Sequence, residues 1–271
     1  MYDTKEIICE AGPGEIYGSK WIGNLAGVLA GKPVNSLHFN GALEADFSFL
    51  DINSRANKGR KFDICFAAPK SLSVAMLFDR EVVAVHQIAN DAAVLWLELY
   101  AMARIKAGGR YIRIATSSGI CAQFLHYTSR AKEPHLHTHN VWLNITTGGA
   151  PLDAAGLYKA KESARAIYFS KLAEGLEAIG YMYRLIPDRT GRAHPELHVP
   201  ESLIYEFSSR RNAIKQKMDE EEFDALSPAA RRLYAYYATR DAKAEEKAAD
   251  HWRAWQRKAI QLGYRKDLKH A

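Results

Sequence analysis

The segment Pro134-His135-Leu136-His137-Thr138-His139-Asn140-Val141-Trp142-Leu143-Asn144 places a histidine at three alternating positions. In a β-strand, side chains two residues apart project from the same face. We therefore expect the three histidines to line one face of a strand over residues 135–146, with the intervening residues on the other face. Imidazoles on one strand face can share a metal ion when a third ligand lies nearby.

A second predicted strand, residues 120–127, carries a further histidine, His126, near its end. Together the two strands predict a cluster of imidazoles that binds a metal ion or performs acid–base catalysis. Alternating histidines are also typical of histidine-triad nucleotide hydrolases, which use them for acid–base chemistry without a metal. The pattern by itself leaves both alternatives open.

The rest of the sequence predicts an antiparallel sheet with helices packed on it. Hydrophobic periodicity and turn residues define these elements. Strands are expected at residues 5–9, 61–68 and 111–116, the last forming a hairpin with 120–127, and at 181–186 and 197–199 as a second hairpin. Helices are expected at 79–107, ended by Gly108-Gly109, and at 162–178, with others opening at Pro200 and Ser227-Pro228.

Because the strands come as hairpins and not as βαβ units, the fold class is α+β: an antiparallel sheet palm with flanking helices. We expect residues 1–200 to form the catalytic core and residues 201–271 a basic helical extension, or flap, within the same domain or as a subdomain.

Composition restricts the partners. The chain has 271 residues with 37 Lys and Arg against 31 Asp and Glu, a net charge of +6, which permits an anionic partner such as DNA. Three widely spaced cysteines argue against a disulfide framework and fit a reducing cytoplasm. No apolar run approaches the roughly 18–20 residues of a membrane span, and no signal peptide is recognisable.

Three blocks of sequence narrow the function. Phe124 to Arg130, followed by Pro134 to His139, resembles the three-histidine motif of conjugative relaxases of the MobF class. These relaxases are HUH endonucleases that nick plasmid DNA at the transfer origin. Phe62 to Ser71 is similar to their Asp-containing strand and Ala-Pro-Lys-Ser turn. Tyr168 to Tyr181, with Phe207-Ser208-Ser209-Arg210, is similar to their downstream helices. The similarity covers roughly residues 60–215.

The resemblance implies site- and strand-specific nicking of single-stranded DNA at an origin of transfer, through a 5′-phosphotyrosine intermediate. It also implies a divalent metal ion, with Mg or Mn expected in the cell and Zn, Ni or Co in vitro. Relaxosome accessory proteins and a helicase are expected outside this chain, since the sequence contains no GxxxxGK[ST] phosphate-binding loop.

Residue by residue, the resemblance assigns metal ligation to His126, His137 and His139. His135 falls where the family does not require histidine and is expected to be a bystander. Asp63 matches the family's acidic residue, which orients a metal-binding histidine or accepts the nucleophile's proton.

The nucleophile in this family is a tyrosine near the N-terminus. The early tyrosines here are Tyr2 and Tyr17, with no adjacent pair. We expect Tyr17 to be the nucleophile, and the lone tyrosine argues against successive cuts by two tyrosines. A rolling-circle replication initiator, which shares this chemistry, and a non-catalytic DNA-binding relative are the alternatives.

DNA contacts are expected from basic and aromatic residues on turns and helices. The expected phosphate contacts are Lys70, Ser71, Arg130, Arg210 and Arg211. Tyr234, Tyr236 and Tyr237 are expected to be available for base stacking.

Overall fold

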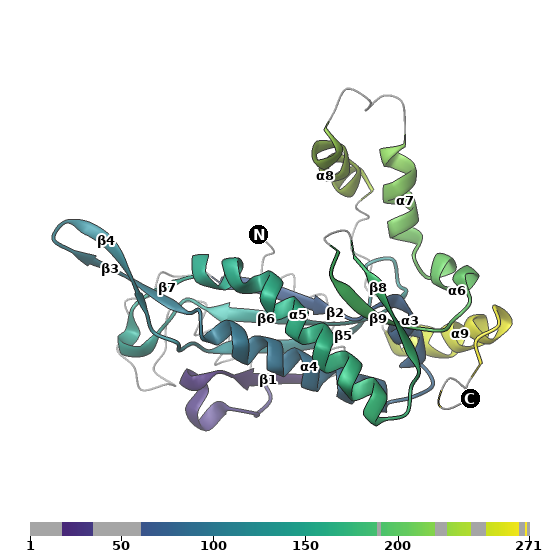
Figure 1. Cartoon of the computed structure of the whole chain (residues 1–271), viewed down its shortest axis with the longest axis horizontal. Helices are drawn as coiled ribbons and strands as arrows, with labels where there is room; N and C mark the ends of the chain where they lie inside the picture. The colour runs from purple at the N-terminus through teal and green to yellow at the C-terminus, as the bar shows by residue number, and fades with distance from the viewer. Residues whose placement is uncertain are drawn as a thin grey trace.

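A four-stranded antiparallel sheet in the order β1-β5-β6-β2 forms the centre of the molecule (Figure 1). The structure is a computed structural model that describes residues 18–34, 61–188, 191–219, 227–239, 248–265 and 269. The strands are β1 (Gly18–Ile22), β2 (Lys61–Ala67), β5 (Cys121–Thr128) and β6 (Pro134–Leu143). The predicted histidine strand is therefore confirmed as β6, and it lies inside the sheet with a neighbour on each side.

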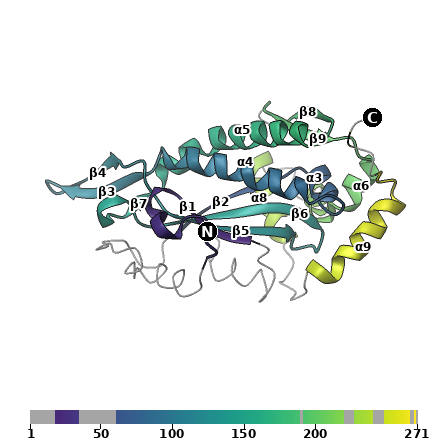
Figure 2. The same ribbon diagram turned by 90° about the horizontal axis from the view of Figure 1, so that it is seen from below.

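Two long helices, α4 (Glu81–Glu98) and α5 (Ala155–Ala178), pack on one side of this sheet (Figure 2). Their buried positions recur at helical spacing, as in Ala89, Ala93 and Leu97 of α4. The two helices approach closely because α5 carries a glycine at the contact: a Cβ on Gly175 would lie 2.5 Å from Cγ1 of Val85. Because α4 and α5 cover one face of the sheet, a functional site on the sheet would lie on the other face.

The predicted helix over residues 79–107 is too long. α4 ends at Glu98, and the chain then forms the strand β3 (Met102–Ala107). Gly108 and Gly109, expected to end the helix, have φ values of 56° and 78° and form the turn of a hairpin instead. Pairing with the next strand outweighs the local helix preference of residues 102–107.

The predicted hairpin between residues 111–116 and 120–127 is wrong. β4 (Arg110–Ala115) pairs with β3, in a second sheet of order β4-β3-β7 that includes the short β7 (Leu152–Asp153). β5 pairs with β1 and β6 in the central sheet. Residues 117–119 are thus a crossover between sheets, and β3 and β4 project from the body as a two-stranded arm (Figure 1).

The remaining elements follow the sequence more closely. β8 (Tyr183–Pro187) and β9 (Ala193–Leu197) form the second expected hairpin. α5 begins seven residues before its predicted start, and a short helix, α3 (Lys70–Ala75), occupies what was expected to be a turn. The antiparallel sheets with flanking helices confirm the α+β class.

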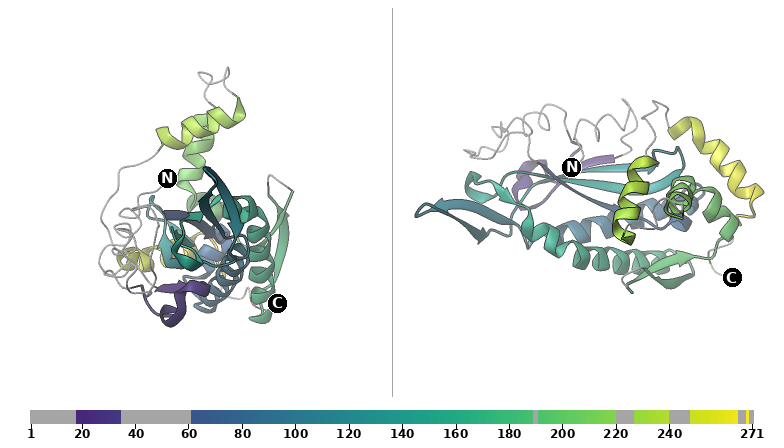
Figure 3. Two further views of the ribbon diagram at one scale, coloured as in Figure 1. Left: turned by 90° about the vertical axis from the view of Figure 1, so that its left-hand side faces the viewer. Right: turned by 90° about the horizontal axis from the view of Figure 1, so that it is seen from above.

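The C-terminal part of the chain contains helices that pack into the core and helices that project from it (Figure 3). Its helices are α6 (Glu201–Glu206), α7 (Ser209–Met218), α8 (Pro228–Ala238) and α9 (Ala248–Gln261). Leu203 and Phe207, together with Trp255 and Ala259 of α9, belong to the same hydrophobic core as the sheet and its helices. α7 and α8 stand away from the sheet (Figure 3). A separate extension beginning at residue 201 remains a proposal, and α7–α8 is the part of it that projects.

Within the described segments, no helix is both long and apolar enough to cross a lipid bilayer. The predicted strand over residues 5–9 and the predicted nucleophile Tyr17 lie outside the described residues.

Candidate metal centre

Three histidines from adjacent strands meet on the sheet face opposite α4 and α5. His126 of β5 is the direct cross-strand partner of His137 of β6, so both side chains project to the same side. The ring centroids lie 5.2 Å apart for His126 and His137, 5.3 Å for His126 and His139, and 5.2 Å for His137 and His139. The structure therefore brings together the trio that the family resemblance selected, as a nearly equilateral triangle of imidazoles.

Hydrogen bonds fix which ring nitrogen carries the proton. Nδ1 of His137 lies 2.8 Å from the carbonyl oxygen of His135, and Nδ1 of His139 lies 2.7 Å from Oδ2 of Asp63. Both partners are acceptors, so each Nδ1 donates its proton, and Nε2 is the lone-pair nitrogen of the neutral ring. Nε2 of His126 is buried and has no hydrogen-bond partner among the described residues.

Burial holds the imidazoles of His126 and His137 in the neutral form, which is the form that binds metals. Burial lowers the pKa of His126 to about 3, with a smaller contribution from the charge of His139. Burial also lowers the pKa of His137 well below its ordinary value. Neutral imidazole is the ligating species, so these rings need lose no proton near pH 7 to accept a metal ion. His126 and His137 are therefore neutral nitrogen donors beside His139, and imidazole is a donor that suits a divalent metal.

Asp63 lies on β2 directly opposite Val141 of β6, on the histidine face of the sheet. Its Oδ2 binds the proton-bearing nitrogen of His139, the arrangement that orients a metal-binding histidine and raises its basicity. Its other oxygen, Oδ1, is buried and has no hydrogen-bond partner in the described part of the chain. The geometry is thus compatible with both expected roles of Asp63, orienting a ligand and accepting a proton.

His135 lies beside the trio without joining it. Its ring stacks on His137 with centroids 4.5 Å apart, and its carbonyl oxygen accepts the His137 proton. Burial lowers the pKa of His135 to about 3. The side chain therefore packs against His137, and the bystander role of His135 stays a prediction.

Ser71, one of the predicted DNA contacts, lies inside the protein. The residue is fully buried on α3, and its Oγ accepts a hydrogen bond from the backbone N–H of Leu197 at 3.1 Å. Lys70 is half-buried and donates from Nζ to the carbonyl oxygen of Pro134 at 2.8 Å. Burial lowers the pKa of Lys70 to about 8. These two residues tie α3 to β9 and to the start of β6; the sequence indicated their place but not their burial.

The predicted arginine contacts lie on two elements, the β5–β6 turn and α7, which are joined by a hydrogen bond from the backbone N–H of Ser209 to Glu133. Arg130 is half-buried in the β5–β6 turn, close in sequence to the ligands. Arg210 of α7 lies over the ring of Tyr236 on α8, 4.7 Å from its centroid, while Arg211 is exposed. Tyr234 and Tyr237 of α8 are exposed as well, so a base could stack on them.

The β3–β4 arm is a basic surface that the sequence analysis missed. By register, Arg104 lies opposite Arg113, and Lys106 lies opposite Tyr111, so all four side chains share one face of the ribbon. Arg104 lies over the Tyr111 ring, and Arg113 binds Asp153 at the base of the arm. The alternation of basic residues in these strands was the available signal, hidden by the helix assigned to residues 102–107.

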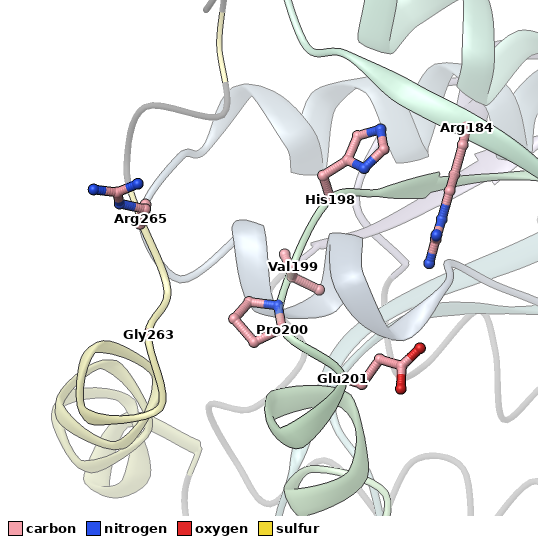
Figure 4. A pocket seen from close by; sticks show the side chains of 7 residues that line it. All are labelled: Arg184, His198, Val199, Pro200, Glu201, Gly263 and Arg265. Atoms are coloured by element: carbon pink, nitrogen blue, oxygen red, sulfur yellow. The ribbon is translucent and has the colours of Figure 1, made fainter.

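The structure also contains a cavity of about 400 Å³ that His126, His137 and His139 do not line (Figure 4). It lies between β8, α6 and the end of α9, and is lined by Arg184, His198, Val199, Pro200, Glu201, Gly263 and Arg265. None of the predicted site residues lines it. The three clustered histidines lie on the sheet face and do not line this cavity.

Comparisons with known sequences agree with this geometry. Residues 13–262 match the family model described as TrwC relaxase. Two multifunctional conjugation proteins TraI, from Escherichia coli and from its strain K12, are 30% and 28% identical over 224 residues. The aligned region is 75% of this chain and 12% of each relative, so the chain spans a small part of their length.

Solved structures agree as well. A copper-bound conjugative relaxase TrwC in complex with origin-of-transfer DNA superposes with a TM-score of 0.83 and 26% identity, over 98% of this chain and 97% of that one. A TrwC complex with a 27-mer DNA comprising the recognition hairpin and the cleavage site gives 0.78 and 26%, over 97% of each chain. The family model and the fold both confirm the resemblance to MobF-class relaxases, and the chain belongs to the TrwC relaxase family.

Proposed function

We propose that this chain nicks one strand of DNA at an origin of transfer and keeps the cut 5′ end as a phosphotyrosine. The observation that carries the proposal is the triangle of imidazoles with the buried Nε2 of His126, which has no partner among the described residues. Membership of the relaxase family supports it, as do the relatives described in complex with origin-of-transfer DNA.

His126, His137 and His139 would hold a divalent metal ion. When bound, such an ion neutralises charge on the scissile phosphate and aligns it for attack. Relatives are described in metal-bound and copper-bound forms. We propose Mg or Mn as the ion in the cell. Zn, Ni or Co would also bind in vitro, because imidazole donors suit these transition metals better than they suit Mg.

Tyr17 is the proposed nucleophile. Gly18, the next residue, pairs with Leu125, whose neighbour along β5 is His126. The described part of β1 thus begins, one residue after Tyr17 in the sequence, beside the end of β5 that carries His126. In the reaction the tyrosine oxygen forms a bond to phosphorus, the bond from phosphorus to the 3′ oxygen breaks, and the 3′-hydroxyl leaves with a proton. Oδ1 of Asp63 is the acceptor proposed for the tyrosine proton.

Two projecting parts would hold the DNA around this centre. The major groove of a duplex admits a two-stranded ribbon, and the face of the β3–β4 arm with Arg104, Lys106, Tyr111 and Arg113 suits such a contact. Arg210, Arg211 and the exposed tyrosines of α8 suit a single strand. Since the substrate is plasmid DNA, we place the protein in the cytoplasm, with accessory proteins and a helicase supplied outside this chain.

The proposal is tested by trapping the covalent product. The protein is incubated with a 5′-labelled and a 3′-labelled single-stranded origin oligonucleotide and Mn²⁺, and the products are separated on a denaturing gel. We expect the label downstream of the cut to migrate with the protein, and Tyr17→Phe to abolish this band. Tyr2→Phe is the matched control and should retain it. Cleavage without a protein-linked product would favour a hydrolase, and binding without cleavage a non-catalytic relative.

A further inference from the structure

The helix-covered face of β6 is polar where such a face is ordinarily apolar. Thr138, between the ligands His137 and His139, and Asn140, which follows them, are 3% and 0% exposed. Both point away from the histidines, toward α4. The strand that carries two proposed ligands therefore has buried polar groups on its reverse side.

His86 of α4 binds the strand between the two ligands. Its Nε2 lies 2.8 Å from Oγ1 of Thr138, and its Nδ1 lies 2.8 Å from the hydroxyl of Tyr168 on α5. Burial lowers the pKa of His86 to about 3, so the ring is neutral, with one donor and one acceptor nitrogen. It accepts from one hydroxyl and donates to the other, which links β6 to both helices.

Asn90, one helical turn further along α4, binds the next inward residue. Its side-chain amide exchanges hydrogen bonds with that of Asn140, at 3.1 Å and 2.9 Å. Asn140 also donates to the carbonyl oxygen of Ile64 on β2 and accepts from Gln123 on β5. One side chain thus connects α4 to the three strands that carry Asp63, His126 and the other two histidines.

Such a network is better suited to fixing geometry than to adding stability. Buried polar groups gain little net free energy over apolar groups of the same shape, but they accept only one arrangement of their partners. The network's side-chain nitrogens and oxygens all have partners. A shift of β6 along its axis would break the bonds at Thr138 and Asn140 together.

We propose that His86 and Asn90 are positioning residues for the metal centre, which hold β6 through Thr138 and Asn140 so that His137 and His139 converge on His126. The inference rests on the proposed metal site. It assigns a role in the reaction to α4 residues on the far side of the sheet, which touch neither metal nor DNA.

The test measures Co²⁺ binding by visible absorption, which reports both affinity and coordination geometry. The variant His86→Leu with Thr138→Val and Tyr168→Phe removes the whole His86 chain and leaves no orphaned partner. We expect about tenfold weaker Co²⁺ binding and an altered absorption band at a nearly unchanged melting temperature. Thr138→Val alone should show the same change if the triple variant fails to fold, and Thr138→Ser, which keeps the hydroxyl, should restore affinity.

Glu98→Gln is the matched control. Glu98 is also a buried polar residue of α4, but it binds the backbone N–H groups of Asn24 and Gly119 and not β6, so its variant should bind Co²⁺ as the wild type does. Wild-type affinity and spectrum in both the triple variant and Thr138→Val would overturn the positioning role. If His126→Ala leaves wild-type Co²⁺ binding unchanged, the metal site itself is wrong and the positioning role falls with it.

Discussion

The two faces of the central sheet at β6 both carry buried polar side chains, but the two sets differ in whether their polar atoms have hydrogen-bond partners. On the inner face, the side chains of Thr138 and Asn140 are fully engaged with α4 and its neighbours. On the outer face, the proton-bearing nitrogens are engaged, while Nε2 of His126 is buried without a partner in the described chain. A satisfied polar group holds position, and an unsatisfied buried one leaves capacity for a ligand. The contrast separates positioning on the inner face of the sheet from binding on its outer face, where His126 comes from β5 and the other two histidines from β6.

The largest effect is expected on the outer face. His126→Ala removes a proposed ligand whose buried Nε2 has no partner in the described part of the chain. Metal affinity and single-turnover cleavage should therefore fall by more than the roughly 10- to 100-fold that loss of a supporting hydrogen bond costs. Calorimetric titration with Mn²⁺ and a gel-based cleavage assay measure both. His135→Ala, on the same face, should lose little; equal losses in the two variants would contradict the selection of the trio.

A smaller loss of metal affinity is expected from Asp63, which contacts the proposed ligand His139. Asp63→Asn keeps the shape of the side chain but weakens its hold on Nδ1 of His139, and should reduce metal affinity by about 10- to 100-fold. The same titration measures it. Asp153→Asn, whose carboxylate binds Arg113 at the base of the arm, is the control and should leave metal affinity unchanged. An Asp63→Asn protein with wild-type affinity would confine Asp63 to proton transfer.

The buried His86 ring on the inner face should make the stability of the folded chain depend on pH. The pKa of His86 is about 3 in the folded chain and near 6.5 when exposed. Between these values the unfolded chain binds the extra proton, so stability is fully present above pH 6.5 and falls as the pH drops toward 3, by roughly 1.4 kcal/mol per pH unit. Melting temperatures measured from pH 7 to pH 5 should fall less steeply in the His86→Leu, Thr138→Val, Tyr168→Phe variant. Equal slopes would mean that His86 is not a buried neutral ring.

The smallest effect is expected at the turn that joins β5 to β6. Nε1 of Trp255 on α9 donates to the carbonyl oxygen of Lys132 at 3.0 Å, so Trp255→Phe should cost about 1 kcal/mol and a few degrees in melting temperature. Trp96→Phe removes an indole N–H that has no partner within the described chain and is the matched control. If both variants melt alike, the α9 contact does not stabilise the turn.

The sequence predicted the centre of the molecule better than its edges. Alternation along residues 135–146 located β6 because a strand with two neighbours keeps its period, and the family resemblance selected His126 over His135. The arm was missed because residues 102–107 favour a helix locally, and their strand state depends on pairing with residues 110–115. The burial of Ser71 was not predicted because it depends on a partner, the backbone of Leu197, which is distant in sequence.

The inner-face network was beyond sequence reasoning for a related reason. In the sequence these residues look like ordinary helix residues: His86, Asn90 and Tyr168. They form one hydrogen-bond network only because α4 and α5 pack against β6. The predicted nucleophile, Tyr17, remains a prediction.

The close approach of α5 to α4 at Gly175 has an evolutionary consequence. A side chain at position 175 would overlap Val85, the residue before His86, and push apart the two helices that hold the His86 ring. A change at one position is then tolerated only with a complementary change at the other. Among homologous relaxases, residues 85 and 175 should therefore vary together, with a larger residue at 175 accompanied by alanine or glycine at 85.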